Sequence, residues 1–150
     1  MKRKQTAVGR CVRFPQEERV GKVVNGLLHT FRTQAHIVAC LEQAGSKNCI
    51  SRAGACHLME ALHGVKQLGK QSVVVDFGSG AGVLLIYFAL MFECRVIGFE
   101  VHEGLVRMAK LLAEEAGVSE LCTFHSADFA AEEYKAQATE ALQQATRDSL

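Results

Sequence analysis

A turn with three alternating glycines is the part of the sequence best suited to chemistry on a bound ligand. It follows a β-branched run that ends in a carboxylate, and its residues are Asp76, Gly78, Ser79, Gly80 and Gly82. Glycine permits a tight bend and lets a ligand approach the backbone, while the helix that follows offers unpaired N–H groups. A dinucleotide fingerprint, G-x-G-x-x-G, would need glycine where this chain has Val83. The spacing therefore departs from the dinucleotide pattern, although NAD and other nucleotides stay open as alternatives.

Carboxylates also follow the next two predicted strands. Glu100 ends the second β-rich run, and Asp128 follows the third, with Phe129 beside it in the sequence. A carboxylate at the position of Glu100 can accept hydrogen bonds from both hydroxyls of a ribose. Asp128 can accept from an adenine amino group, and the ring of Phe129 can cover the base. Because parallel strands end at one edge of a sheet, we expect Asp76, Glu100 and Asp128 to converge there, although each alone is equally typical of a turn.

The elements that must position these residues alternate between strand and helix. β-Branched runs predict strands at 72–76, 95–100 and 121–125. Apolar residues at helical spacing predict helices at 83–92 and 105–116. Strands separated by helices form parallel β-α-β units with right-handed crossovers. Residues 71–150 are therefore predicted to form an α/β domain, the front half of a doubly wound sheet.

Other segments flank this unit. Residues 1–15 are polar and basic, which predicts a flexible arm. Residues 16–70 read as a helical segment whose second helix spans about 55–68, after a turn-rich linker at 48–54. At the other end, residues 130–150 are rich in Ala, Gln and Glu and contain no β-branched run. A helix is predicted there, and no fourth strand.

The turn and the strand ends together resemble class I methyltransferases that use S-adenosylmethionine, whose first motif has the form D-x-G-x-G-x-G. A narrower similarity is to the non-SET histone-lysine methyltransferases of the disruptor-of-telomeric-silencing type. It is carried by Asp76-Phe-Gly-Ser-Gly, Gly98-Phe-Glu-Val-His-Glu-Gly-Leu105 and Ala127-Asp-Phe129, over about a third of the chain. The resemblance implies a Rossmann-like fold that places the glycine turn at the methionine part of the cofactor, Glu100 at the ribose, and Asp128 with Phe129 at the adenine.

The chain departs from that subfamily on the side of the methyl acceptor. Ser51-Arg-Ala-Gly54 stands where the subfamily has an acidic tyrosine-glycine motif, and residues 130–150 lack the later strands and the asparagine-containing loop. The resemblance therefore implies a truncated methyltransferase, the cofactor-binding half, acting on protein lysine with histone as the specific case. No catalytic residue is assigned. The alternative is a catalytically silent binding or regulatory module that pairs with a partner chain along its incomplete sheet.

Composition narrows the class of protein, its location in the cell and the kinds of site that it can contain. The 150 residues are 49% hydrophobic and 22% charged, which is typical of one globular domain. The longest apolar run, Val83 to Phe92, is much shorter than the roughly twenty residues of a spanning helix. No secretory signal follows Met1, so an intracellular location, cytoplasmic or nuclear, is predicted. The six cysteines include no C-x-x-C pair, and no metal site is expected.

The net charge of +1 hides a difference between the two halves of the chain. Residues 1–75 carry twelve Lys and Arg against four Asp and Glu, whereas 76–150 carry five against twelve. The basic half could bind an acidic partner such as nucleic acid, or it could fold against the acidic half.

Overall fold

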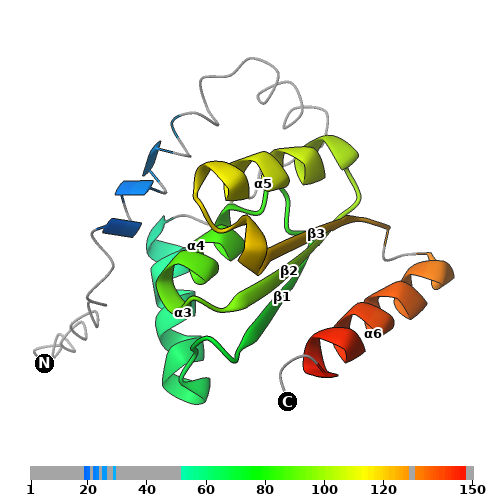
Figure 1. The fold of residues 1–150 in the computed structure, drawn as a ribbon, viewed down its shortest axis with the longest axis horizontal. Helices are drawn as coiled ribbons and strands as arrows, with labels where there is room; N and C mark the ends of the chain where they lie inside the picture. Colours follow the sequence, from blue (N-terminus) through cyan, green and yellow to red (C-terminus); the bar gives the residue numbers. More distant parts are fainter. Residues whose placement is uncertain are drawn as a thin grey trace, which may run out of the picture.

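Strands and helices alternate along the chain (Figure 1). The computed structural model describes residues 19, 20, 22, 23, 25, 26, 29, 52–128 and 131–147. In chain order the elements are α3 (Arg52–Lys66), β1 (Val73–Phe77), α4 (Val83–Phe92), β2 (Arg95–Glu100), α5 (Glu103–Glu115), the 3-10 turn η1 (Ser119–Leu121), β3 (Cys122–Ser126) and α6 (Glu132–Arg147). The predicted β-α-β-α-β order is therefore confirmed, and the tail is helical, as predicted.

The three strands form one parallel sheet with β2 in the middle. Phe99 of β2 is in register with Phe77 of β1 and with His125 of β3. Parallel neighbours need crossover connections, which α4 and α5 provide. The predicted α/β class with three parallel strands is thus confirmed. β1 and β3 each begin and end one residue later than predicted, because hydrogen bonding to β2, rather than β-branched composition alone, sets where a strand pairs.

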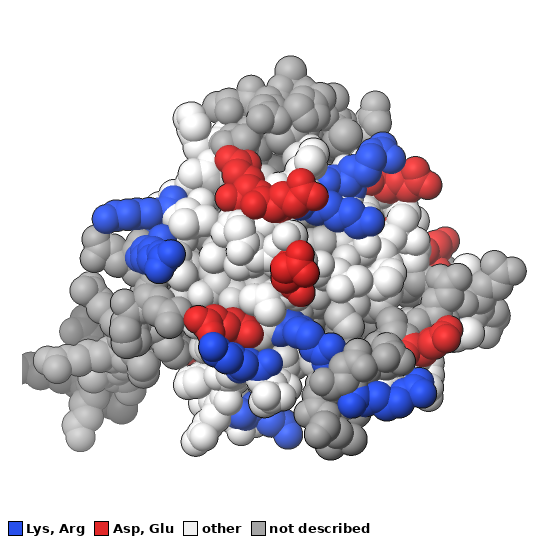
Figure 2. All heavy atoms as spheres, in the orientation of Figure 1, with Lys and Arg blue, Asp and Glu red and all other residues white. Residues whose placement is uncertain are grey.

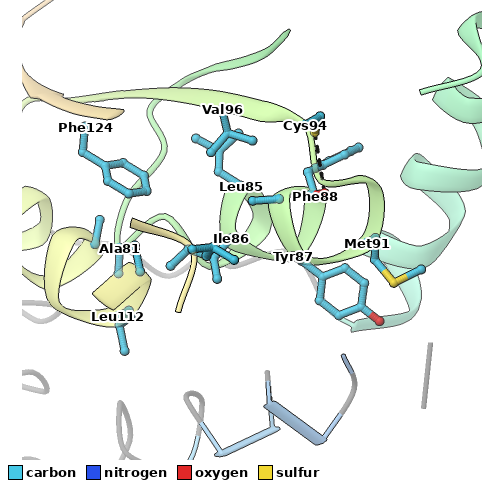
Figure 3. Packing of buried hydrophobic residues seen from close by; sticks show 14 of the residues in the cluster. Ala81, Leu85, Ile86, Tyr87, Phe88, Met91, Cys94, Val96, Leu112 and Phe124 are labelled. Carbon is cyan, nitrogen blue, oxygen red and sulfur yellow. Dashed lines mark hydrogen bonds between the residues drawn. The ribbon is translucent and has the colours of Figure 1, made fainter. Parts of the chain in front are cut away.

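Helices α4 and α5 cover one face of the sheet. α4 is apolar on every side, and it packs against the sheet and α5. It also contacts α3, since the ring of His63 stacks on that of Phe92 with 5.2 Å between the centroids. Leu85 and Ile86 of α4 belong to one buried cluster with Val96 of β2 (Figure 3). Burying each large apolar side chain of this kind stabilises the fold by about 1.5–3 kcal/mol. This cluster is the main core of the described chain.

Helix α6 lies on the opposite face of the sheet (Figure 1). Its Ala138 is buried in a second, smaller cluster with Ile97 and Phe99 of β2. Successive residues of a strand point to opposite faces, so Ile97 and Phe99 face α6 whereas Val96 faces α4 and α5. On the α6 face three rings stack across the strands, Phe77 on Phe99 at 5.4 Å and Phe99 on His125 at 5.0 Å. Such cross-strand ring pairs fix the register at the carboxyl end of the sheet.

Helix α6 lies on the other face of the sheet from α4 and α5, and this determines at which edge a further strand could be added. Crossovers through α4 and α5 move the chain from β1 to β3 along one direction. Because such crossovers are right-handed, a strand connected through a helix on the other face would lie in the opposite direction along the sheet, on the β1 side. Among the described residues, no strand pairs with the second edge of β1. That edge of β1 is therefore the place where a further parallel strand would be added.

The helix predicted before the first strand differs from the prediction at both of its ends. α3 begins at Arg52, inside the segment predicted as a linker, because Arg and Ala extend a helix readily. It ends at Lys66, two residues early, since Gln67 takes a left-handed conformation with φ 50°. Val20 is buried in the same cluster as Met59 of α3. The arm predicted at 1–15, and most of 16–51, lies outside the described residues.

Acidic and basic side chains are interspersed on the face seen in Figure 2. The difference in charge between the two halves of the sequence therefore gives no single-sign patch among the described residues on that face. None of the helices in the described part of the chain is long and apolar enough to cross a membrane.

Candidate functional site

The turn between β1 and α4 is built on left-handed backbone conformations. Gly78, Gly80 and Gly82 have φ values of 83°, 56° and 71°, a region that glycine adopts without steric cost. The backbone N–H groups of Gly78 and Ser79 both donate to the carbonyl of Phe99, at 2.8 and 3.0 Å. The turn is therefore held against the carboxyl end of β2.

The glycines of this region fall into two groups. A Cβ at Gly82 would lie 2.5 Å from the ring of Phe124, and one at Gly98 would lie 2.6 Å from the same ring. These two positions need glycine so that α4, β2 and β3 can approach one another. A Cβ at Gly78 or Gly80 would meet nothing within 4 Å. The turn is thus packed tightly on its inner side and has open space around Gly78 and Gly80, where a ligand can approach the backbone.

Glu100 lies at the carboxyl end of β2 and is the one buried charged residue of the described chain, with 7% of its surface exposed. The N–H of Gly80 donates to its Oε2 at 2.9 Å, and the N–H of His102 donates to its Oε1 at 3.0 Å. A buried carboxylate needs such donors. Both oxygens are therefore held in place, and each keeps a further lone pair for a ligand.

Asp76 lies near Glu100 at the same edge of the sheet. Burial, and secondly the negative charge of Glu100, raise the pKa of Asp76 above its ordinary value. Two carboxylates close together in a half-buried site favour a positively charged group and repel a phosphate. This electrostatic setting supports a cationic ligand at the turn.

Asp128 follows β3 at the same edge but is exposed. The N–H of Ala127 donates to the carbonyl of Glu100 at 2.8 Å, which continues the pairing of β2 and β3 to this point. The carbonyl of Asp128 accepts from the N–H of Ala131 at 3.1 Å, one residue before α6 begins. Phe129, predicted to cover a base, lies outside the described residues.

Ser79 contributes a buried hydroxyl to the site. Its Oγ has no hydrogen-bond partner within the part of the chain that the structure describes. It lies close to Gly98, because a Cβ added at Gly98 would be 2.7 Å from the Ser79 Oγ. A buried hydroxyl without a partner costs free energy, so it is a feature that a bound ligand could satisfy after a small movement.

Of the cysteines whose side chains the structure describes, Cys94 is buried and Cys122 is half-buried. Burial raises the pKa of Cys94 to about 11 and that of Cys122 to about 12. Cys94 donates weakly to the carbonyl of Phe88 at 3.6 Å (Figure 3). Within residues 52–128, 131–147 and the other described positions, no three His, Cys, Asp or Glu side chains are grouped as metal ligands.

Two features of the site were not predicted from the sequence. The closeness of Gly98 to Phe124 has a sequence signal, since an isolated glycine inside a strand often marks a close approach. The bond from His102 to Glu100 has none, because its donor is the main chain. The first feature could therefore have been predicted from the sequence, and the second could not.

Comparison with known proteins gives one family. Residues 68–142, half of the chain, match the family described as a methyltransferase domain. The matched segment contains the turn, all three strands and Glu100. No curated protein matched the chain.

Several solved structures are similar to parts of the chain. One is an RNA methyltransferase from Salinibacter ruber in complex with S-adenosyl-L-homocysteine, at 30% identity and a TM-score of 0.44, covering 48% of this chain and 47% of that one. Another is a SAM-dependent methyltransferase from Geobacter sulfurreducens in complex with the same ligand, at 24% identity and a TM-score of 0.49, covering 73% and 36%. This chain thus spans less than half the length of either protein.

Proposed function

This chain belongs to the methyltransferase domain family, and on that premise we propose that its β-α-β unit is the cofactor-binding half of an S-adenosylmethionine-dependent methyltransferase. One observation carries the proposal. The carboxylate of Glu100 is held at the carboxyl edge of the sheet by the amides of Gly80 and His102, with a lone pair left on each oxygen. A carboxylate so placed suits the two hydroxyls of a ribose.

The same geometry argues for an adenosyl cofactor over a dinucleotide. A pyrophosphate would use the free N–H groups of the turn. Here the N–H of Gly80 is occupied by Glu100, and those of Gly78 and Ser79 by the carbonyl of Phe99. The carboxylates of Asp76 and Glu100 would repel a phosphate and attract a sulfonium or an ammonium group. The electrostatics of the turn therefore favour S-adenosylmethionine.

Each predicted residue has a place in this proposal. The open side of Gly78 and Gly80, together with Asp76 and the hydroxyl of Ser79, would receive the methionine part, and Gly82 keeps the turn against β3. Glu100 would bind the ribose. Asp128 and Phe129 would contact the adenine, on the strength of the family resemblance.

The methyl acceptor is a finer part of the proposal. In methyl transfer the bond from sulfur to methyl breaks as the acceptor forms its own bond to the methyl group, and the acceptor gives up a proton. Most of the rate comes from aligning the two groups in a site with little water. We propose protein lysine, and histone lysine as the specific case, because the segments at 76–80, 98–105 and 127–129 resemble that subfamily. The cell's interior, cytoplasm or nucleus, is the corresponding location.

Calorimetric titration of the chain with S-adenosylhomocysteine tests the cofactor assignment. We expect binding of this ligand and none of NAD; heat signals for NAD alone would overturn the assignment. A methyl-transfer assay on the purified chain, with histones as acceptor, tests the second part. Because the acceptor side is not part of the sequence that resembles the subfamily, we expect little turnover, and rapid turnover would contradict a cofactor-binding half.

An alternative function would use the second edge of β1, with which no strand pairs among the described residues. Val73, Val74 and Val75 are apolar toward both faces, as in strands that lie inside a sheet. In this alternative we propose a catalytically silent cofactor-binding or regulatory module, which pairs with a strand of a partner chain at that edge.

A further inference from the structure

The backbone N–H of His102 has a place in the site that no side-chain pattern reveals. It donates to Oε1 of Glu100 at 3.0 Å, while the N–H of Gly80 donates to Oε2 at 2.9 Å. The two donors come from different loops, one before α4 and one before α5, and they hold the two oxygens separately. The carboxylate therefore cannot rotate without breaking one of these bonds.

We propose that the His102 N–H is a specificity-determining donor that, together with the Gly80 N–H, fixes Glu100 in the orientation that recognises the intact cis-diol of a ribose. The inference rests on the proposed function and deepens it. An ionised carboxylate offers about four lone-pair positions. Two are used by the backbone, and the other two, one on each oxygen, match the two hydroxyl donors of a cis-diol. A 2′-deoxy ligand offers one donor fewer, and a 2′-phosphate brings a negative charge against the carboxylate.

A simpler role for the His102 N–H would be to help start α5, for which His102 is the N-cap. The two roles give different readouts. If the bond only supports the helix, its removal lowers the stability of the fold and leaves the preference for ribose over deoxyribose unchanged. If it positions Glu100, its removal lowers that preference in the molecules that remain folded.

Proline substitution removes the donor with little change in shape. His102 has φ −85° and ψ 105°, close to the fixed φ of proline. Glu103→Pro is the matched control, because proline is favoured at the first helical position and the extended conformation of His102 is the one that tolerates a following proline. That control removes an amide one residue further on, which does not donate to Glu100. His102→Ala keeps the N–H and separates the imidazole from the backbone.

The experiment measures Kd by calorimetry for S-adenosylhomocysteine and for its 2′-deoxy analogue. We expect the wild type and Glu103→Pro to prefer the ribose ligand by about tenfold, and His102→Pro to lose most of that preference. An unchanged preference in His102→Pro, or an equal loss in His102→Ala, would overturn the inference while leaving the cofactor assignment intact. Failure of the wild type to bind S-adenosylhomocysteine would instead overturn the proposed function itself.

A second measurement does not depend on a variant that folds. Amide hydrogen exchange in the wild type should show Gly80 and His102 protected in the free chain and equally protected with S-adenosylhomocysteine bound. If their exchange becomes faster on binding, Glu100 leaves these donors to reach the ligand, and the inference is wrong.

Discussion

The ring of Phe124 on β3 lies against the bare α-carbon of Gly98 on β2, its register partner, with no room for a methyl group between them. A Cβ at position 98 would be 2.6 Å from the ring, and 2.7 Å from the hydroxyl of Ser79. The contact ties the middle of the sheet to the glycine turn. Packing in the core and the shape of the candidate site therefore depend on the same glycine.

Gly98→Ala is expected to lower the free energy of unfolding by about 1–3 kcal/mol, because the added methyl group must displace Phe124 or the turn. Denaturant unfolding followed by circular dichroism measures it. Gly69→Ala is the matched control, since Gly69 also has no left-handed φ and a Cβ there would meet nothing within 4 Å. Equal stability of the two variants would show that the sheet tolerates the larger residue.

Glu100→Ala is expected to weaken binding of S-adenosylhomocysteine by about 1–3 kcal/mol, because the ribose loses its acceptor. The variant also leaves the N–H groups of Gly80 and His102 without their acceptor, so some loss of stability should accompany it. Calorimetric titration measures the affinity. Glu103→Ala serves as the control, because Glu103 is an exposed carboxylate on α5 that forms an ion pair with Arg107. An affinity unchanged by Glu100→Ala would remove the ribose role from this residue.

The sequence allowed the strands, the turn and the carboxylate at the end of β2 to be predicted, because each has a local signal. β-Branched runs mark strands, alternating glycines mark the bend, and residues 83–92 are too uniformly apolar to be anything but buried. The position of α6 on the opposite face could not be predicted, since its amphipathic pattern is compatible with either side. The donors to Glu100 could not be predicted either, because main-chain N–H groups carry no residue type.

Asp76→Asn is expected to stabilise the fold at neutral pH. Burial, and then the charge of Glu100, raise the pKa of Asp76 in the folded state, so the folded chain binds a proton more readily than the unfolded chain does. Stability contributed by this residue therefore falls as the pH rises from the unfolded pKa through the folded one. The gain should be less than about 1 kcal/mol, because solvent screens a half-buried group.

Unfolding midpoints at pH 7.5 and at pH 4 check this prediction. The difference between Asp76→Asn and the wild type should be present at pH 7.5 and smaller at pH 4. Binding of the cationic cofactor should weaken in the same variant, because the site loses a negative charge. A variant that is less stable than the wild type at both pH values would show that the Asp76 carboxylate has a structural role that its burial does not reveal.

Cys94 and Cys122 are expected to react slowly with thiol reagents in the folded chain. At pH 8 a thiol whose pKa is raised to about 11, as for Cys94, has about a hundredfold less thiolate than an ordinary one, and Cys122, at about 12, has less still. Labelling with a chromogenic disulfide measures the rate, in a variant in which the other four cysteines, Cys11, Cys40, Cys49 and Cys56, are replaced by Ser. Rapid labelling without denaturant would show that this part of the core opens readily.

No strand pairs with the second edge of β1 among the described residues, which predicts uneven amide exchange within the sheet. An edge strand uses only part of its N–H groups to pair with its neighbour, and the others point away from the sheet. In the purified chain we expect the outward N–H groups of Val73–Phe77 to exchange at least about tenfold faster than those of Val96–Phe99, which lie between two strands. The amides of β2 are the internal control in the same nuclear magnetic resonance spectrum.

If every amide of β1 exchanges as slowly as those of β2, the edge is already covered and cannot accept a partner's strand. Selective slowing of the outward amides, on addition of a candidate partner protein, would locate the added strand at this edge.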